Sequence, residues 1–546
     1  MPGRPWWEEA VVYQVYPRSF CDTDGDGVGD LEGVRGKLDH LAWLGVGAIW
    51  LSPFYRSPMA DFGYDVADYC DVDPLFGTLD DFDHLVADAH ARGIKVIVDW
   101  VPNHTSDRHP WFLASRSSRD DPKRSWYVWR DGPGGGPPDP PPNNWRSAFP
   151  GVGRRERPPA WTWDDATGQW YLHLFLPEQP DLDWANPEVR AAMAGVLRFW
   201  MARGVDGFRV DVVQALGKDP SLPDVPDHLQ PPSGTNDRPE THPILAELRR
   251  VVDGFDPGPA PRMMVGEVYL PTARQVADYH GTPERPELHL AFNFSPLFAP
   301  WDADEWRVRI DEVRTLIEAR PAWPTWVLSN HDNPRHRTRY GSEARARAAA
   351  VLLLCLRGTP FLYAGEELGL DDAEVPPERR VDPGHRDGCR APIPWDATPA
   401  HGWASTEPWL PWPPGADAGT DAATQRDDPS SMLQLYRRLL AARRASPALR
   451  SGTFAWLHSP AGTLAWLRTA EGGDATGSHP ATGPGAADRA GDRRAVLIDV
   501  AGAGATVELP PGGWRCEVHS LDAGATSTVR GSYRLDPGAA VVLAPA

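Results

Sequence analysis

An arginine and an aspartate stand two residues apart in an apolar stretch, and they are the first candidates for chemistry. Residues 204–213 read Gly-Val-Asp-Gly-Phe-Arg-Val-Asp-Val-Val, and this β-branched and aromatic content is typical of a buried strand. Side chains alternate between the faces of a strand, so Arg209 and Asp211 project from the same face. A neighbouring guanidinium lowers the pKa of a carboxylate and keeps it ionised. Asp211 is therefore either half of a buried ion pair that fixes local geometry or a reactive group.

Three other apolar stretches also end in groups that exchange protons or bind hydroxyls. They are Asp99-Trp-Val-Pro-Asn-His104, Gly266-Glu267 and Asn330-His331-Asp332. Each group taken alone could be a buried polar residue with satisfied hydrogen bonds. Their repetition at the ends of separate predicted strands favours one shared site.

Glycoside hydrolysis is the chemistry that suits such a set. It uses an ionised carboxylate to attack or stabilise an oxocarbenium-like centre, and a protonated carboxyl to donate to the leaving oxygen. Asp211, beside Arg209, is the predicted nucleophile. Glu267 has no cationic neighbour in the sequence and follows the apolar Met263-Met-Val265. We therefore expect burial to raise the pKa of Glu267, as a general acid requires.

A scaffold must bring the ends of these strands together. Short apolar strands are predicted at Val11–Tyr16, Ala48–Ser52, Lys95–Trp100, Val205–Asp211, Met263–Val268, His289–Phe294, Thr325–Ser329 and Pro360–Ala364. Amphipathic helices are predicted at Leu31–Leu44, Leu79–Arg92, Pro187–Arg203, Pro243–Val252, Glu305–Ala319, Glu343–Arg357 and Ser430–Ala445. This alternation predicts an α/β fold, a closed (β/α)8 TIM barrel whose working groups lie at the carboxyl ends of the strands. A doubly wound open sheet is the alternative, but no Gly-rich phosphate loop follows any strand.

The pattern changes along the chain predict three domains. Residues 105–180, rich in Pro, Gly and Trp, predict a subdomain inserted after the third strand and overhanging the barrel rim. The catalytic barrel is assigned to residues 1–104 and 181–450. Beyond it, short alternating runs predict a C-terminal antiparallel β-domain, a β-sandwich over residues 451–546. Within that domain, the Gly- and Ala-rich residues 470–493 are predicted to be a disordered hairpin tip.

Composition narrows the partners and the compartment. The net charge of −20 over 546 residues argues against nucleic acid or an anionic membrane and favours a small neutral substrate. The sequence starts without the apolar core of a signal peptide, and no apolar run approaches a membrane span. The five cysteines are scattered without metal-site spacing and predict reduced thiols. We therefore expect a cytoplasmic protein, either a monomer or a homodimer.

An acidic loop is a second candidate site. Residues 22–30 read Asp-Thr-Asp-Gly-Asp-Gly-Val-Gly-Asp, and their oxygens repeat like the first ligands of an EF-hand. Gly33 stands where an EF-hand has its bidentate glutamate, so this is not a true EF-hand. The loop is either a divalent-cation site or a solvated acidic turn.

Taken together, the motifs resemble those of glycoside hydrolase family 13, the α-amylase superfamily, and within it the α-glucosidase and oligo-1,6-glucosidase branch. The matching segments are Asp99-Trp-Val-Pro-Asn-His104, Gly207-Phe-Arg-Val-Asp211, Gly266-Glu267-Val, Ser329-Asn-His-Asp332, Gln179-Pro-Asp-Leu-Asp183, Gly63-Tyr-Asp-Val-Ala-Asp-Tyr69 and Gly388-Cys-Arg-Ala-Pro-Ile-Pro-Trp395. The sequence departs from the branch at Asp183, where asparagine is common.

The resemblance implies a retaining mechanism. Asp211 would form a covalent glucosyl intermediate, Glu267 would act as acid and then base, and Asp332 would grip sugar hydroxyls. The implied substrate-binding residues are Tyr64, Asp65, His104, Phe175, Gln179, Arg209, His331 and Arg390. Among them, Tyr64 would stack on the sugar, and Asp65 with Arg390 would cap its non-reducing end. Such a cap implies release of one glucose at a time.

The resemblance also implies a structural divalent ion in the acidic loop, Ca²⁺ with Mg²⁺ as the alternative, and no organic cofactor. The implied ligands are Asp22, Asp24, Asp26, Asp30 and the carbonyl of Val28. The leading expectation is thus an exo-acting α-glucosidase that acts on malto-oligosaccharides and on isomalto-oligosaccharides or sucrose. A same-fold alternative is a glucosyltransferase or isomerase of the trehalose synthase or sucrose isomerase type. A remote alternative is a non-catalytic relative of the family.

Overall fold

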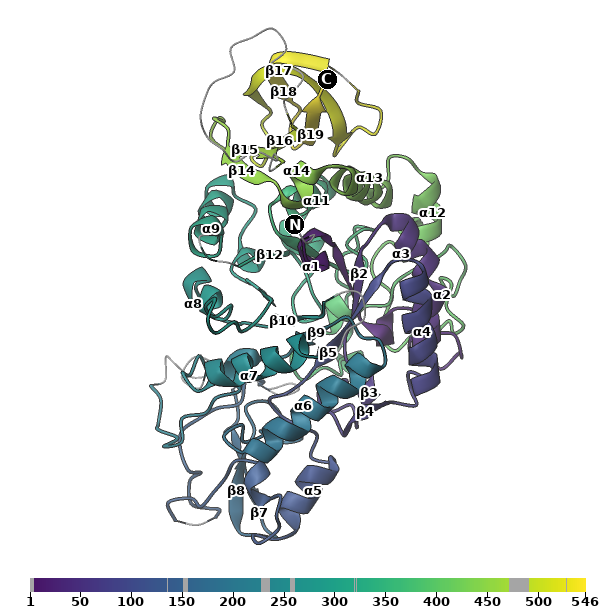
Figure 1. The fold of residues 1–546 in the computed structure, drawn as a ribbon. Helices are drawn as coiled ribbons and strands as arrows, with labels where there is room; N and C mark the ends of the chain where they lie inside the picture. Colours follow the sequence, from purple (N-terminus) through teal and green to yellow (C-terminus); the bar gives the residue numbers. More distant parts are fainter. Residues whose placement is uncertain are drawn as a thin grey trace.

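The predicted barrel strands form one sheet in which all neighbours are parallel, in the order β11-β10-β9-β5-β2-β1-β13-β12 (Figure 1). The computed structural model describes residues 4–134, 136–150, 156–226, 236–255, 261–318, 320, 322–470, 491–526 and 528–546. The strands are β1 (Val12–Val15), β2 (Ala48–Leu51), β5 (Lys95–Trp100), β9 (Gly207–Val210), β10 (Met263–Gly266), β11 (Leu290–Ala291), β12 (Thr325–Val327) and β13 (Thr359–Tyr363).

A side chain joins the two edge strands of this sheet. The Thr325 hydroxyl donates to the carbonyl of Ala291 at 2.8 Å and accepts from the amide of Asn293 at 3.4 Å. The sheet is therefore a nearly closed barrel, which confirms the predicted (β/α)8 fold class.

Strand alternation produces two cores in the barrel. Ile97 and Val265 belong to one buried cluster, whereas their strand neighbours Val98 and Met264 belong to another. This is the period of two that a strand imposes when both of its faces are covered. Arg209 is paired in register with Val265, so it shares the face of that residue.

Helices cover the outside of the barrel. They are α1 (Trp6–Glu9), α2 (Leu31–Gly36), α3 (Leu38–Leu44), α4 (Leu79–Ala91), α6 (Pro187–Ala202), α7 (Thr241–Asp253), α8 (Ala273–Asp278), α9 (Ala303–Leu316), α10 (His336–Tyr340), α11 (Glu343–Cys355), α12 (Ala422–Asp427), α13 (Met432–Ala445) and α14 (Pro447–Ser451). The predicted helix Leu31–Leu44 is two helices. The first ends at Gly36, a poor helix former, and Lys37 has φ −102° and ψ 4°, outside the helical range.

The segment inserted after β5 contains a small sheet of its own. It holds α5 (Pro110–Ser117) and a three-stranded antiparallel sheet in the order β6-β8-β7, formed by β6 (Trp129–Arg130), β7 (Trp161–Asp164) and β8 (Gln169–Leu172). A two-stranded ribbon, β3 (Tyr55–Arg56) with β4 (Asp68–Val72), follows β2. The inserted sheet lies at one end of the molecule and the C-terminal sheet at the other (Figure 1).

The C-terminal strands form one six-stranded antiparallel sheet, in the order β14-β15-β16-β19-β17-β18. They are β14 (Thr453–Trp456), β15 (Thr463–Thr469), β16 (Arg493–Asp499), β17 (Ala505–His519), β18 (Thr528–Leu535) and β19 (Ala540–Pro545). The predicted runs 505–509 and 514–519 are parts of the single long β17, whose register shifts twice. The predicted hairpin tip at 470–493 lies almost entirely outside the described residues.

Within the described part of the chain, every helix is too short or too polar to cross a membrane. The cytoplasmic location stays a prediction.

Candidate active site

A single buried guanidinium holds three carboxylates at the carboxyl ends of the central strands. Asp99 in β5 is paired in register with Arg209 in β9, and Asp211 and Glu267 directly follow β9 and β10. Arg209 contacts Asp99 at 2.9 Å, Asp211 at 2.5 Å and Glu267 at 2.9 Å. The barrel therefore brings together the four charged groups that the sequence placed at its strand ends.

The shared arginine changes the expected environment of both carboxyls. Burial raises the pKa of Asp211 well above its usual value; Arg209 opposes this shift, while Glu267 and Asp99 add to it. The prediction that Arg209 keeps the Asp211 pKa low is thus wrong, because its one positive charge is divided among three anions. Glu267 was expected to have no cationic neighbour, but β9 places Arg209 against it.

Asp332 has the opposite electrostatic environment. It contacts Arg386 at 2.9 Å, Arg390 at 3.2 Å and the ring of His331 at 3.3 Å. Burial by itself would raise the pKa of Asp332, but His331, Arg386 and Arg390 together hold it well below its usual value. Asp332 is therefore an anion at neutral pH, suited to accepting hydrogen bonds from hydroxyls.

The predicted Asp65–Arg390 cap is not formed. The Asp65 carboxylate is fully buried and accepts hydrogen bonds from the Ser57 hydroxyl and from the amides of Ala60 and Asp61. It therefore stabilises the loop in which it lies. Arg390 pairs with Asp332 and Asp382 instead.

A different ion pair, between Arg386 and Asp61, takes the place of the predicted Asp65–Arg390 pair. Arg386 contacts Asp61 at 2.5 Å and also reaches Asp332. Gln179, at 3.1 Å, donates a second hydrogen bond to Asp61. The sequence offered one signal for this pair, since Asp61 precedes Tyr64 by three residues in the loop that carries the family motif.

These groups surround a cavity of about 370 Å³, within the size range of small-molecule sites. The predicted residues that line it are Tyr64, His104, Phe175, Asp211, Glu267 and Asp332. The predicted residues outside the lining are Asp65, Gln179, Arg209, His331 and Arg390. Lining residues that sequence reasoning missed as binding groups include Asp61, Phe149, Gln214, Asn236, Tyr269 and Arg386.

His331 is not part of the cavity lining but lies behind Tyr64, which is. Its ring is stacked on Tyr64 with the centroids 5.3 Å apart, and its Nε2 lies 2.5 Å from the Tyr64 hydroxyl. The hydroxyl in turn donates to Asp99 at 3.0 Å. Tyr64 is thus held in place on the side away from the cavity, which fixes the face that it presents to a ligand.

Comparison with known proteins identifies the family. The family described as the α-amylase catalytic domain matches residues 14–452. The chain belongs to the α-amylase family. It is 43% identical to a probable α-glucosidase of Rhizobium meliloti, covering 86% of this chain and 88% of that one. It is 37% identical to an oligo-1,6-glucosidase of Parageobacillus thermoglucosidasius, covering 83% and 86% of the two chains. The solved trehalulose synthase of Pseudomonas mesoacidophila is 32% identical over the full length of both chains, with a TM-score of 0.85.

This α-amylase family member has a strained backbone between its two central carboxylates. Val212, which follows Asp211, has φ 44° and ψ 44°, a left-handed conformation that is rare for a β-branched residue. Such a conformation costs on the order of 1–3 kcal/mol. It lets the Val212 amide donate to Glu267 at 3.0 Å. The strain therefore holds a fixed donor against the predicted general acid.

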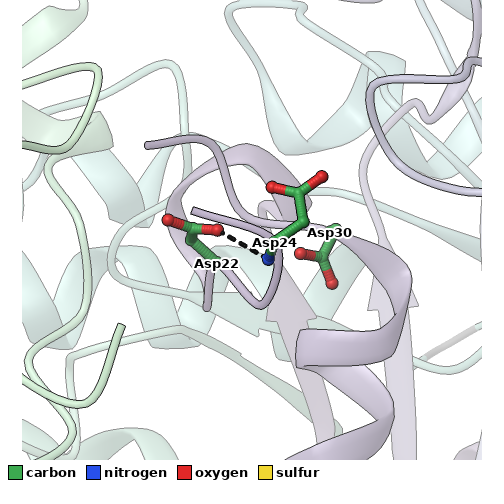
Figure 2. A group of neighbouring side chains, drawn as sticks. All are labelled: Asp22, Asp24 and Asp30. Carbon is green, nitrogen blue, oxygen red and sulfur yellow. Dashed lines mark hydrogen bonds between the residues drawn. The ribbon is translucent and has the colours of Figure 1, made fainter. Parts of the chain in front are cut away.

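The acidic loop of this family member gathers part of its predicted ligand set. Carboxylate oxygens of Asp22, Asp24 and Asp30 all lie within 4.8 Å of one another, on the turn that leads into α2 (Figure 2). Asp26 was also predicted as a ligand but lies outside this group; its carboxylate accepts from the amide of Val28. Three hard oxygen donors in one turn fit Ca²⁺ or Mg²⁺.

Proposed function

We propose that the protein is an exo-acting, retaining α-glucosidase that releases glucose from short neutral α-glucosides. The observation that carries the proposal is the Asp211–Glu267 pair on one shared guanidinium, in a cavity that the Asp61–Arg386 ion pair also lines. The α-glucosidase and oligo-1,6-glucosidase names of relatives support the same reaction class.

The proposed mechanism needs one proton on the Asp211–Glu267 pair. Burial raises the pKa of Asp211, which favours a shared proton on the pair, because two coupled carboxyls titrate as a unit. When substrate binds, that proton is held by Glu267. Glu267 donates it to the leaving oxygen while the Asp211 carboxylate attacks the anomeric carbon. Glu267 then takes a proton from water, and the resulting hydroxide displaces Asp211.

The proposed exo-action rests on the Asp61–Arg386 pair. Both residues line the cavity, and Arg386 also contacts Asp332. Together they would supply two carboxylates and a guanidinium to the hydroxyls of a terminal glucose. Charge-assisted hydrogen bonds of this kind favour a sugar that ends there over one that continues.

A glucosyl transfer reaction is the second candidate. Tyr269 lines the cavity and packs against Phe294, with the ring centroids 5.2 Å apart and the ring planes tilted by 49°. Such an aromatic wall binds apolar sugar faces and can retain a released sugar as an acceptor in place of water. The similarity to a trehalulose synthase over the full chain supports this alternative.

For the acidic loop, the proposal is a structural Ca²⁺, with Mg²⁺ as the alternative, on Asp22, Asp24 and Asp30. When bound, the cation would neutralise like charges in the turn before α2. It takes no part in the proposed chemistry, and an organic cofactor is not part of the proposal.

A substrate panel with product identification tests the function. Maltose, isomaltose, sucrose and an aryl α-glucoside are each incubated with the enzyme, and products and their anomeric form are followed by NMR. Hydrolysis with retention yields only monosaccharides, with α-glucose formed first. A new disaccharide would instead favour transfer, β-glucose as the first product would overturn the retaining mechanism, and lack of turnover on all four would overturn the proposal.

A further inference from the structure

A buried lysine outside the cavity lining is connected to it through one asparagine. The Lys218 ammonium donates to Asn103 Oδ1 at 2.7 Å and to the Ala215 carbonyl at 2.7 Å, and lies 2.9 Å from Asp181 Oδ2. Its side chain is 8% exposed. Asn103 is adjacent to His104, whose ring lines the cavity.

The ammonium determines the orientation of the Asn103 amide. An ammonium group only donates hydrogen bonds, so the oxygen of Asn103 must face Lys218. The amide nitrogen of Asn103 then faces Nδ1 of His104, at 3.1 Å. Because an amide nitrogen only donates, Nδ1 must carry a lone pair, and the proton of the neutral ring must be on Nε2.

A second contact is compatible with the same tautomer. Nε2 of His104 lies 3.1 Å from the backbone carbonyl of Tyr64, which only accepts. The Nε2 of Gln179 is equally close to that nitrogen. Gln179 donates one hydrogen of this amide group to Asp61, and its oxygen accepts from the amide of Leu176. We therefore assign the Nε2 proton of His104 from the contact of Nδ1 with Asn103, and the Tyr64 carbonyl is its acceptor.

We propose that Lys218 is a positioning residue which, through Asn103, holds His104 as the neutral tautomer with its proton on Nε2. The inference deepens the proposed α-glucosidase function and rests on it: the Nε2–H group then donates to the carbonyl of Tyr64 and holds the His104 ring, which lines the cavity, in one orientation toward the sugar. A charged imidazolium is disfavoured, because it would set a proton on Nδ1 against the amide of Asn103. The charged groups that act on His104 are Asp181 and Lys218. Burial lowers the pKa of His104 to about 4, in agreement with a neutral ring.

Asn103→Asp is the decisive variant because it reverses the hydrogen bond at equal size. The new carboxylate can accept from Nδ1, so the neutral ring would lose its Nε2 proton and regain it only as an imidazolium. We expect kcat/KM on an aryl α-glucoside to fall about tenfold at pH 8, the loss of about one hydrogen bond. Activity should recover toward lower pH as His104 gains its second proton.

Lys218→Met should change the same profile in the same direction, because the Asn103 amide is then free to turn and Asp181 is left without its cation. Lys95→Met is the matched control. Lys95 is a partly buried lysine that contacts Asp206 at 2.7 Å and lies outside the cavity lining. It should lower stability and leave the shape of the pH profile unchanged. A wild-type profile in both Asn103→Asp and Lys218→Met would overturn the proposal.

The wild-type protein provides a test that does not depend on activity. With ¹⁵N-labelled histidine, NMR assigns the protonated nitrogen of His104 by comparison with a His104→Gln sample. A proton on Nε2 at pH 7 supports the proposal, and a proton on Nδ1 overturns it. If the substrate panel fails while Nε2 is protonated, the proposed function is wrong but the tautomer assignment stands.

Discussion

At the scale of single residues, the pKa of each carboxyl in the site depends on several charged neighbours and on burial. Arg209 is divided among Asp99, Asp211 and Glu267, so burial prevails at Asp211 and raises its pKa. Asp332 instead lies against two arginines and a histidine, and its pKa is lowered. Asp211 and Asp332 thus have opposite pKa shifts within one cavity, and such perturbed pKa values cluster at functional sites.

Removing either central carboxyl should separate the two roles. We expect Asp211→Asn to lower kcat by at least about four orders of magnitude with every substrate, because no covalent intermediate forms. Glu267→Gln should be as damaging with maltose but much milder with a dinitrophenyl glucoside, whose leaving group needs no proton. Steady-state kinetics on both substrates checks this, with circular dichroism to confirm folding.

Asp183→Asn is the matched control for these two amide substitutions. Asp183 is partly exposed, and its carboxylate accepts from the amide of Ala185, within its own turn. It should retain near-wild-type kinetics. Wild-type rates in Asp211→Asn would contradict the assignment of the nucleophile.

Asp61 and Asp65 offer a direct comparison of a sugar-facing and a structural carboxylate. Asp61→Asn should raise KM and lower kcat/KM by about 10–100-fold, since a charge-assisted hydrogen bond to the terminal glucose is weakened. Asp65→Asn should leave KM near its wild-type value but lower the free energy of unfolding by about 1–3 kcal/mol, because a donor amide would face backbone donors. Kinetics with thermal melts measures both, and a reversed pattern would restore the Asp65 cap.

At the scale of elements, each strand contributes little more than its last residues, and the loops supply the rest. Asp61 and Tyr64 come from the loop between β3 and β4, and Arg386 comes from the long segment after β13. The first βα loop is anchored at both ends. Its Asp22 accepts from Ser405 of that same long segment at 3.0 Å, and Asp30 caps α2 by accepting from the amide of Gly33. A cation in the acidic loop would therefore stiffen two parts of the rim together.

Adding Ca²⁺ to chelator-treated protein should raise the melting temperature with little effect on kcat. A ligand that binds only the folded state at one hundred times its Kd adds about 2.7 kcal/mol to stability. Asp24→Asn should abolish much of this shift, whereas Asp26→Asn, outside the carboxylate cluster, should preserve most of it. Differential scanning fluorimetry across Ca²⁺ and Mg²⁺ concentrations measures the shifts. Identical melting curves with chelator and with either ion would contradict the metal proposal.

At the scale of the whole molecule, buried arginines tie the C-terminal sheet to the barrel. Arg468 in β15 donates to the carbonyls of Cys355, Gly452 and Thr453, and Cys355 is the last residue of α11. The carbonyl end of a helix favours a cation. Arg347 in α11 donates in the other direction, to the carbonyl of Ser520 at 3.1 Å. The sheet and the barrel helix α11 are thus joined by hydrogen bonds in which each of them supplies an arginine donor.

Arg468→Met should lower the free energy of unfolding by about 2–4 kcal/mol, because it leaves buried carbonyl groups without hydrogen-bond donors. Urea unfolding followed by tryptophan fluorescence and by far-UV circular dichroism measures the change. Arg534→Met, on an exposed position of β18, is the control and should stay within about 0.5 kcal/mol of the wild type. An unchanged midpoint for Arg468→Met would show that this contact does not stabilise the assembly.

The sequence by itself determined the fold class and placed charged groups at the ends of its strands. Apolar strands with a period of two, acids at their ends and the intervening helices are local patterns, and local patterns suffice to predict a parallel barrel. The same local logic placed Arg209 and Asp211 on one face.

Only the tertiary structure decided which charges meet. Arg386 and Asp61 are 325 residues apart, and Arg209 receives Asp99 and Glu267 from separate strands. The direction of the Asp211 pKa, the exclusion of Asp65 from the cap and the path from Lys218 to His104 all depend on such contacts. Electrostatic energies depend on the distance between the charged groups and on their burial, and the separation of two residues in the sequence gives neither quantity.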